Sequence, residues 1–299
     1  MTAKKKSARP SRPKTPDLTK LEEQIRELAA TPREKPLPRE AREVVKALLD
    51  ALEAGSIRAA RCDADGSWHA VEWVKMGILV AFRAGVAKTV AVAGDPPIVR
   101  FIDKDTVPAR LLDPADGVRV VPGGSSVRRG AYLARGVVCM PPMFVNVGAY
   151  VGSGSMIDSH ALVGSCAQIG ERVHLSAAAQ VGGVLEPVNA APVVVEDDVI
   201  VGGNCGVYEG TIVRARAVLA AGVVLTRGTP IFDLVRDRVH SALPGEALEV
   251  PAGAVVVPGA RAARGPWAES QGLSLQTPVI VKYRDSRTDL STTLEKWLR

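Results

Sequence analysis

An aliphatic residue returns at every sixth position through the middle of the chain, from Val127 to Ile231. The repeat positions are Val127, Leu133, Cys139, Val145, Val151, Ile157, Val163, Ile169, Leu175, Val181, Val195, Val201, Val207, Val213, Leu219, Leu225 and Ile231. Sixteen of these seventeen positions are Val, Ile or Leu, and the one interruption lies at 186–194. A helix needs apolar spacings of three and four, and a half-buried strand needs alternation, so neither template fits this period.

The remaining positions of the hexad indicate what it builds. The residue after each aliphatic is usually small or polar, as in Gly152 and Gly164, and a small residue such as Ala149 or Ala167 recurs four positions after it. This pattern suits very short strands joined by bends. Hexapeptide repeats are the signature of a parallel β-helix. Three hexads close one triangular coil, so the repeat predicts about six coils stacked at about 4.8 Å.

The flanking segments predict a mixed region before the repeat and a cap after it. Thr15-Pro16-Asp17 is expected to start a first helix, and a second helix is expected to stop at Gly55. Asp65-Gly66 is a turn pair for a hairpin, and 73–82 has the pattern of a buried helix. After Pro230 we expect strands at 250–259 and 279–283 and a terminal helix at 290–298, which together cover the last coil.

The predicted fold is therefore mainly β. We expect four parts: a disordered basic tail at 1–16, an N-terminal α/β domain at 17–110, a hexapeptide-repeat β-helix at 111–235 and a C-terminal β cap with a terminal helix at 236–299. Capping the first coil is as good an explanation of the N-terminal domain as catalysis is.

The charge of the chain is confined to its first residues. The net charge is +6, and residues 1–20 carry seven Lys or Arg against one Asp, so the other residues balance. With only twelve aromatic residues and no basic stripe interleaved with them, nucleic-acid binding is not expected. The tail is interpreted as a solubilising leader.

The four cysteines form no Cys-x-x-Cys pair, and three of them lie inside the repeat as small apolar residues. We expect reduced packing residues and no metal site. No run of eighteen apolar residues and no signal peptide occur, so a cytoplasmic protein without membrane contact is expected.

Functional residues should be those that break the repeat's small-or-aliphatic rule, because a β-helix is a scaffold. The conspicuous ones are Arg119, Asp158, His160, His174, Glu186, Tyr208, Glu209, Arg214 and Arg216. For the arginines, a solvated outward side chain is the simpler interpretation. His174, between Val173 and Leu175, is more typical of a structural histidine than of a base.

Several segments resemble one family of hexapeptide acyltransferases. They are Val145 to Asp158 (VNVGAYVGSGSMID), Val163 to Gly170 (VGSCAQIG), Val173 to Ser176 (VHLS), Gly182 to Pro187 (GGVLEP) and, upstream, Val118 to Pro122 (VRVVP) with Gly130 to Arg135 (GAYLAR). Together these segments resemble the tetrahydrodipicolinate N-succinyltransferases of lysine and diaminopimelate biosynthesis. The resemblance extends from about residue 40 to about residue 285.

This resemblance implies a left-handed coil, a homotrimer with active sites between neighbouring β-helices, and no permanently bound cofactor. It implies transfer of succinyl from succinyl-CoA to the amine of tetrahydrodipicolinate, after hydration and opening of the cyclic imine, to give N-succinyl-2-amino-6-oxopimelate. The family's substrate-binding arginine maps onto Arg119, and its substrate-binding, catalytic aspartate maps onto Asp158. Contacts with CoA are assigned to Ala220, Ala221, Gly222 and Arg227.

The chain departs from the family at one turn. Where well-known members have Glu-x-x-Glu-Gly, this chain has Gly206-Val-Tyr-Glu209-Gly210, so the first glutamate is missing. This departure has three explanations. Either Glu209 takes over as the catalytic group, or a carboxylate at this turn is dispensable, or the substrate differs. Counted by hexads, Asp158 lies on the third face and Glu209 on the first or second, so a site that uses both needs two chains.

Three other functions stay open at this point. One is an acetyl-CoA-dependent enzyme for the same substrate or for a different amine. Another is a histidine-based acyltransferase that uses His160 or His174. The third is a catalytically inactive paralogue with a scaffolding role, which the glycine at 206 suggests.

Overall fold

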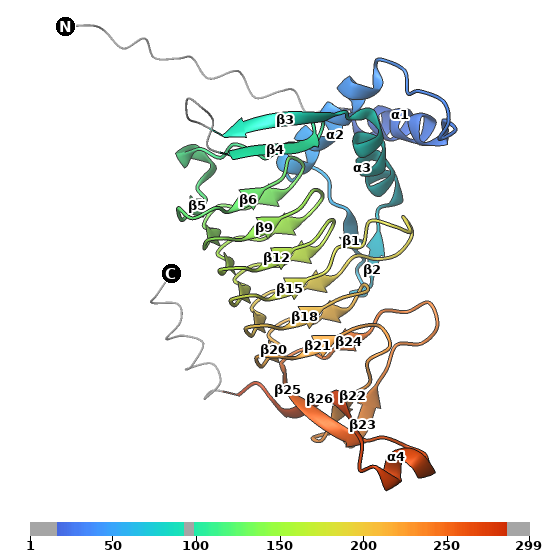
Figure 1. The fold of residues 1–299 in the computed structure, drawn as a ribbon, viewed down its shortest axis with the longest axis vertical. Coiled ribbons are helices and arrows are strands. Elements are labelled where there is room, and N and C mark those ends of the chain that lie inside the picture. The colour runs from blue at the N-terminus through green and yellow to red at the C-terminus, as the bar shows by residue number, and fades with distance from the viewer. Residues whose placement is uncertain (1–16, 93–98, 286–299) are drawn as a thin grey trace, which may run out of the picture.

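The computed structural model describes residues 17–92 and 99–285. In this part of the chain a three-sided parallel β-helix carries helices at one end and a β arm at the other (Figure 1). The basic tail at 1–16 and the terminal helix expected at 290–298 lie outside the described residues.

Three parallel sheets form the sides of the helix. Sheet I contains β6 (Ser126–Val127), β9 (Phe144–Val145), β12 (Leu162–Val163), β15 (Gln180–Val181), β18 (Gly206–Val207) and β21 (Val224–Leu225). Sheet II contains β7 (Tyr132–Leu133), β10 (Tyr150–Val151), β13 (Gln168–Ile169), β16 (Val194–Val195), β19 (Ile212–Val213) and β24 (Glu249–Val250). Sheet III contains β5 (Arg119–Val120), β8 (Val138–Cys139), β11 (Met156–Ile157), β14 (His174–Leu175), β17 (Ile200–Val201), β20 (Val218–Leu219) and β25 (Ala254–Ala262), and it continues through β26 (Ser274–Tyr283), β22 (Ile231–Asp233) and β23 (Arg238–His240).

The register confirms the predicted coil of three hexads. Tyr150 pairs with Gln168, one coil of eighteen residues further on. At the interruption Gln168 pairs with Val194, so the segment 182–193 is extruded as a loop and adds no face. All seventeen repeat positions are buried, with at most 5% of any of them exposed. Small residues such as Ala149 and Ala167 are buried beside them, so each hexad has two inward positions.

The turns between strands form three edges of the prism. Edge III–I consists of the turns after β8, β11, β14, β17 and β20, and it includes Asp158. Edge I–II follows the strands of sheet I and includes the extruded loop and Glu209. Edge II–III follows the strands of sheet II. The chemistry of the three edges differs, and this decides where a site can be.

The N-terminal region contains the elements expected from the sequence and one that was missed. It consists of α1 (Leu18–Ala30), α2 (Ala41–Glu53), β1 (Ala60–Cys62), β2 (Trp68–Ala70), α3 (Glu72–Ala84), β3 (Ala87–Val92) and β4 (Val99–Lys104). The first helix is capped by Asp17, whose carboxylate accepts from the amides of Thr19 and Lys20. Asp17 is the last residue of the segment expected to start this helix, and Thr15 and Pro16 lie outside the described residues. The β3–β4 hairpin was not predicted.

This region packs on edge I–II and on sheet II. Val147 and Cys166, both in turns of edge I–II, belong to the core of the helical region. Arg129 forms ion pairs with Asp50 and Glu53 of α2, each at 2.5 Å. The β1–β2 hairpin runs down the side of the prism (Figure 1), where the Trp68 indole donates to Glu196 at 3.0 Å. The region therefore covers one edge and one face.

After Ile231 the coil is completed by segments that return from an insertion. Val213 pairs with Val250 and Leu219 pairs with Val256, both in parallel. β25 and β26 then form an antiparallel arm with α4 (Pro266–Ser270) at its tip. β25 begins and ends later than the strand expected at 250–259, and β26 extends the strand expected at 279–283 back to Ser274. A short 3-10 helix (Pro114–Asp116) precedes β5. No helix in the described part of the chain has the length and apolar character needed to cross a membrane.

Candidate functional site

Asp158 and His174 lie side by side on sheet III and edge III–I. Met156 pairs with His174, and Asp158 follows two residues later in the turn after β11. One carboxylate oxygen of Asp158, Oδ1, accepts from the amide of Ser159 at 2.7 Å. The other, Oδ2, lies 3.8 Å from His174 Nε2, and 30% of the aspartate side chain is exposed. The local turn therefore holds the carboxylate through Oδ1 and leaves the side chain partly exposed.

Arg119 lies on the same sheet, at the start of the coil. β5 pairs with β8, which pairs with β11, so about 10 Å separates the strand of Arg119 from that of Asp158. Arg119 is exposed, and its guanidinium forms no ion pair with any residue in 17–92 or 99–285. The expected substrate-binding arginine and aspartate thus share a face without touching, which leaves space between them for a small dicarboxylate.

His160 follows Asp158 in the same turn but plays a different structural role. It is exposed and adopts a left-handed backbone with φ 62°. Its amide donates to Pro142 O and its carbonyl accepts from Gln180 Nε2 at 3.1 Å. Its backbone joins successive coils, and His174 is the histidine next to the carboxylate.

Edge III–I continues from Asp158 as a track of small residues. The next turns are Ser176-Ala177-Ala178, Gly202-Gly203-Asn204 and Ala220-Ala221-Gly222, all half-buried or exposed. Ala220 to Gly222 lie three strands from Asp158, at a distance of about 14 Å along the edge. Side chains this small leave backbone amides within reach of an extended ligand.

Arg227 does not join that track. It lies on edge I–II, where its backbone amide donates to Glu209 Oε2 at 3.1 Å. Sheet I therefore separates Arg227 from Ala220 to Gly222, and the four residues assigned to CoA form two groups. Glu209 is exposed, with φ 55°, in the turn after β18.

Asp158 and Glu209 occupy opposite edges of sheet I. Asp158 belongs to the turn before β12 and Glu209 to the turn after β18. With no face added at the extruded loop, Glu209 follows a first-face strand and Asp158 a third-face strand. The separation predicted from the hexad count is confirmed, since one chain does not bring the two carboxylates together.

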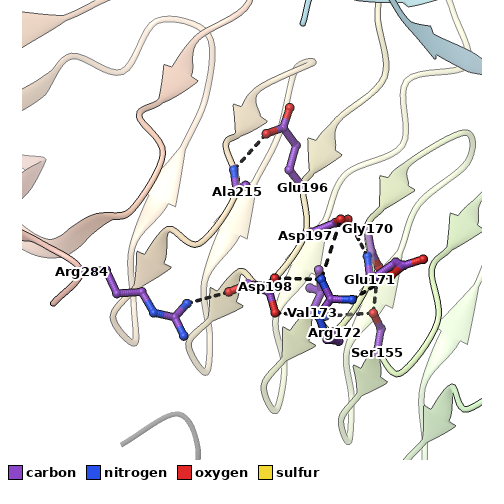
Figure 2. Close-up of polar contacts among 10 residues, drawn as sticks. All are labelled: Ser155, Gly170, Glu171, Arg172, Val173, Glu196, Asp197, Asp198, Ala215 and Arg284. Carbon is purple, nitrogen blue, oxygen red and sulfur yellow. Dashed lines mark hydrogen bonds and ion pairs between the residues drawn. The ribbon is translucent and has the colours of Figure 1, made fainter. Parts of the chain in front are cut away.

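Edge II–III is occupied by ion pairs (Figure 2). Arg172 forms a two-point contact with the carboxylate of Asp198 at 2.8 and 2.9 Å and also binds Glu171 at 2.8 Å. These hydrogen bonds with Asp198 raise the pKa of Arg172. Arg284 donates to Asp198 O at 2.8 Å, which ties the end of the β arm to the coil. This edge is a structural ladder between coils.

The two arginines singled out near this edge are structural. Arg214 binds Glu249 at 2.9 and 2.6 Å, Glu196 at 2.9 Å and Gly66 O at 2.8 Å. It thereby fastens the β1–β2 hairpin to sheet II. Arg216, with φ 62°, lies in the same turn as Arg214, and its carbonyl accepts from the guanidinium of Arg284 at 3.4 Å. Neither is placed beside Asp158.

A cleft of about 900 Å³ lies beside edge I–II. Its lining includes Ala190 and Ala191 of the extruded loop, Gly210 and Arg227 of the coil, and Arg238 of β23. Glu186, at the start of the loop, lies 4.0 Å from Arg33 and lines a separate apolar pocket. The described residues contain no group of three or more His, Cys, Asp or Glu that could hold a metal ion.

One buried residue beside this cleft was missed in the sequence. Lys75 of α3 is 0% exposed, and its ammonium donates to the carbonyls of Pro187 and Ala190 at 3.0 and 2.7 Å. A lysine within the otherwise apolar segment 73–82 was the available signal.

Two family models and a solved structure are similar to parts of this chain. A family model described as tetrahydrodipicolinate N-succinyltransferase N-terminal matches residues 20–84, and one described as hexapeptide repeat of succinyl-transferase matches residues 192–227. Among solved structures, the chain is similar to a 2,3,4,5-tetrahydropyridine-2-carboxylate N-succinyltransferase from Campylobacter jejuni, with a TM-score of 0.43 and 16% identity over 84% of this chain and 64% of that chain.

Curated relatives match almost the whole chain. A 2,3,4,5-tetrahydropyridine-2,6-dicarboxylate N-succinyltransferase from Paramagnetospirillum magneticum is 42% identical over 87% of this chain and 90% of its own length. A protein of the same name from Bradyrhizobium diazoefficiens is 43% identical over the same shares. The resemblance found in the sequence is thus confirmed, and the chain belongs to the tetrahydrodipicolinate N-succinyltransferase family.

Proposed function

We propose that this protein transfers the succinyl group of succinyl-CoA to the amine of ring-opened tetrahydrodipicolinate, in diaminopimelate and lysine biosynthesis. The observation that carries the proposal is the 42% identity, over 87% of the chain, to relatives named for this activity. The product is N-succinyl-2-amino-6-oxopimelate, and free CoA is released.

Asp158 is the proposed proton acceptor. The amine nitrogen attacks the thioester carbonyl, the C–N bond forms, and the C–S bond breaks with departure of the CoA thiolate. The nitrogen must lose a proton in this step, and a fixed, partly exposed carboxylate is suited to take it. His174, 3.8 Å from that oxygen, limits where the carboxylate can point.

Arg119 is the proposed binding group for a substrate carboxylate. A guanidinium presents two parallel donors to a carboxylate, and that of Arg119 is exposed on the same face as Asp158. The space of about 10 Å between the two strands suits a substrate with a carboxylate near each end.

The acyl donor is proposed to lie along edge III–I. Its thioester would be near Asp158 and its pantetheine arm would run over the small-residue turns to Ala220, Ala221 and Gly222. The amide groups of this arm can form hydrogen bonds with backbone N–H and C=O groups of these turns, because the small side chains do not cover them. Arg227, on edge I–II, is proposed to contact the donor from a neighbouring chain.

Three chains are proposed to assemble through their coils, which we take to be left-handed as in the family, in the cytoplasm. The N-terminal region already covers edge I–II in part and sheet II. On edge III–I, in the described part of the chain, the turns 176–178, 202–204 and 220–222 are half-buried or exposed. Glu209 of one chain is proposed to act with Asp158 of its neighbour, because within one chain they lie at opposite edges of sheet I. Light scattering after size exclusion tests this assembly, and an active monomer would contradict it.

Thiol release from succinyl-CoA, measured with and without tetrahydrodipicolinate, tests the function. Release that depends on both substrates is expected. Faster release from acetyl-CoA would identify an acetyltransferase, and no release from either donor would favour the inactive paralogue suggested by Gly206.

A further inference from the structure

Lys75 is buried in a setting that an ammonium group rarely occupies. Its side chain is among the largest that are fully buried, and it is 0% exposed. Burial lowers the pKa of Lys75, since removing the ammonium from water disfavours the charged form. No carboxylate among the described residues forms an ion pair with it. Burying an ammonium group is costly unless hydrogen bonds replace those it made with water, so the acceptors of Lys75 matter.

The two acceptors of Lys75 belong to one turn of the extruded loop. Its ammonium donates to Pro187 O at 3.0 Å and to Ala190 O at 2.7 Å, and the amide of Ala190 itself donates to Pro187 O at 3.1 Å. Lys75 therefore binds both ends of the turn 187–190 and holds it against α3.

The loop held in this way supports the Glu209 turn. A β-carbon placed on Gly210 would lie 2.7 Å from Ala191 O, so the loop and the turn after β18 are in close contact. Glu209 then accepts from the amide of Arg227 in the next coil. Contacts thus run from Lys75 through the loop and Gly210 to Glu209 and Arg227, and the loop and Arg227 line the cleft of about 900 Å³.

We propose that Lys75 is a positioning residue for the part of the acyl-donor site that each chain supplies to its neighbour. It fixes the extruded loop, and the loop in turn supports the turn of Glu209 and, through Glu209, the backbone at Arg227. The identity of the ligand rests on the proposed function. The two hydrogen bonds by which Lys75 holds the loop, here called the clamp, do not depend on it. Lys75 does not line the cleft, so its effect must pass through the loop.

Hydrogen exchange tests the clamp directly. In the wild-type protein the amide of Ala190, which donates to Pro187 O, should exchange slowly. Lys75→Met should accelerate exchange of this amide and of the loop 184–193 by about tenfold or more, because the carbonyls of Pro187 and Ala190 lose a donor. Lys20→Met, which changes an exposed lysine of α1, is the matched control and should leave the loop unchanged. Fast loop exchange in the wild type, or slow exchange in Lys75→Met, would overturn the proposal.

Kinetics separate positioning from general stabilisation. Lys75→Met should raise the KM for succinyl-CoA about fivefold or more with a smaller change in kcat, and Lys75→Gln, which keeps an N–H donor, should recover part of the loss. If Lys75→Met does not fold, Lys75→Gln is measured in its place. A mobile loop with an unchanged KM would overturn the link to the donor site. An inactive wild type with a clamped loop would contradict the proposed function and leave the clamp intact.

Discussion

The aromatic ring of Tyr208 lies directly over Gly206. A β-carbon on Gly206 would be 2.9 Å from both Cζ and the hydroxyl oxygen of Tyr208, closer than such atoms approach in proteins. The same ring would meet a β-carbon on Gly182 at 2.8 Å. The Tyr208 ring therefore fills the space into which a glutamate side chain at position 206 would project. A tyrosine at 208 in this position requires a glycine at 206.

Gly206→Glu alone is expected to destabilise the protein without raising kcat. The new side chain must displace the Tyr208 ring, and overpacking of this kind costs about 1–3 kcal/mol. Gly206→Glu combined with Tyr208→Ala should recover most of the lost stability. Thermal unfolding and steady-state kinetics of both variants check this, and a single variant as stable as the wild type would contradict the geometry.

Asp158→Asn should lower kcat by about 10²-fold or more. The asparagine oxygen can still accept from the amide of Ser159, so the turn should keep its shape while the proton acceptor is lost. Turnover with saturating substrates measures the effect. A variant with wild-type kcat would remove Asp158 from the mechanism and make His174, its neighbour, the next group to test.

Arg119→Lys should mainly raise the KM for the dicarboxylate, by about tenfold. Lysine keeps the charge but loses the two parallel donors that match a carboxylate. Because Arg119 is exposed on β5, the melting temperature should not change. A loss confined to kcat would show that Arg119 acts on the transition state and not on substrate binding.

Glu209→Gln should lower kcat by about tenfold and leave the melting temperature unchanged. Glutamine retains an oxygen that can accept from the amide of Arg227, so the substitution removes the charge and preserves the turn. Turnover and thermal unfolding are measured together. If kcat does not change, Glu209 serves the structure of edge I–II alone, and proton transfer depends on Asp158 and water.

Only Cys62 of the four thiols should react in the native protein. It is exposed, whereas Cys139, Cys166 and Cys205 are buried. Burial raises the pKa of Cys139 and Cys166 to about 12, so at pH 8 both are protonated and poor nucleophiles. Mass spectrometry after brief alkylation should find one modified cysteine before unfolding and four afterwards. Rapid native labelling of Cys166 would show that the contact between the helical region and edge I–II opens.

Which residues are buried in the β-helix followed from the sequence alone. A period of six fixes one inward aliphatic for each strand, so positions such as Val163 and Leu219 could be assigned to the core without a structure. The same period placed Asp158 and Glu209 on different faces, because three hexads always close one coil. Family membership followed from segments long enough to be specific.

Contacts that join distant segments needed the tertiary structure. The sequence did not reveal that the β1–β2 hairpin crosses sheet II, since Trp68 and Glu196 are 128 residues apart and no periodicity connects them. The sequence offered Arg214 as a possible site residue. The hydrogen bonds of Arg214 with Gly66 O and Glu249 show that this arginine fastens the hairpin to the coil. The roles of Lys75 and Tyr208 likewise depend on what lies against them. A repeat determines how each residue faces its own coil, whereas the partner of an outward side chain depends on which non-repeating segment packs over that edge.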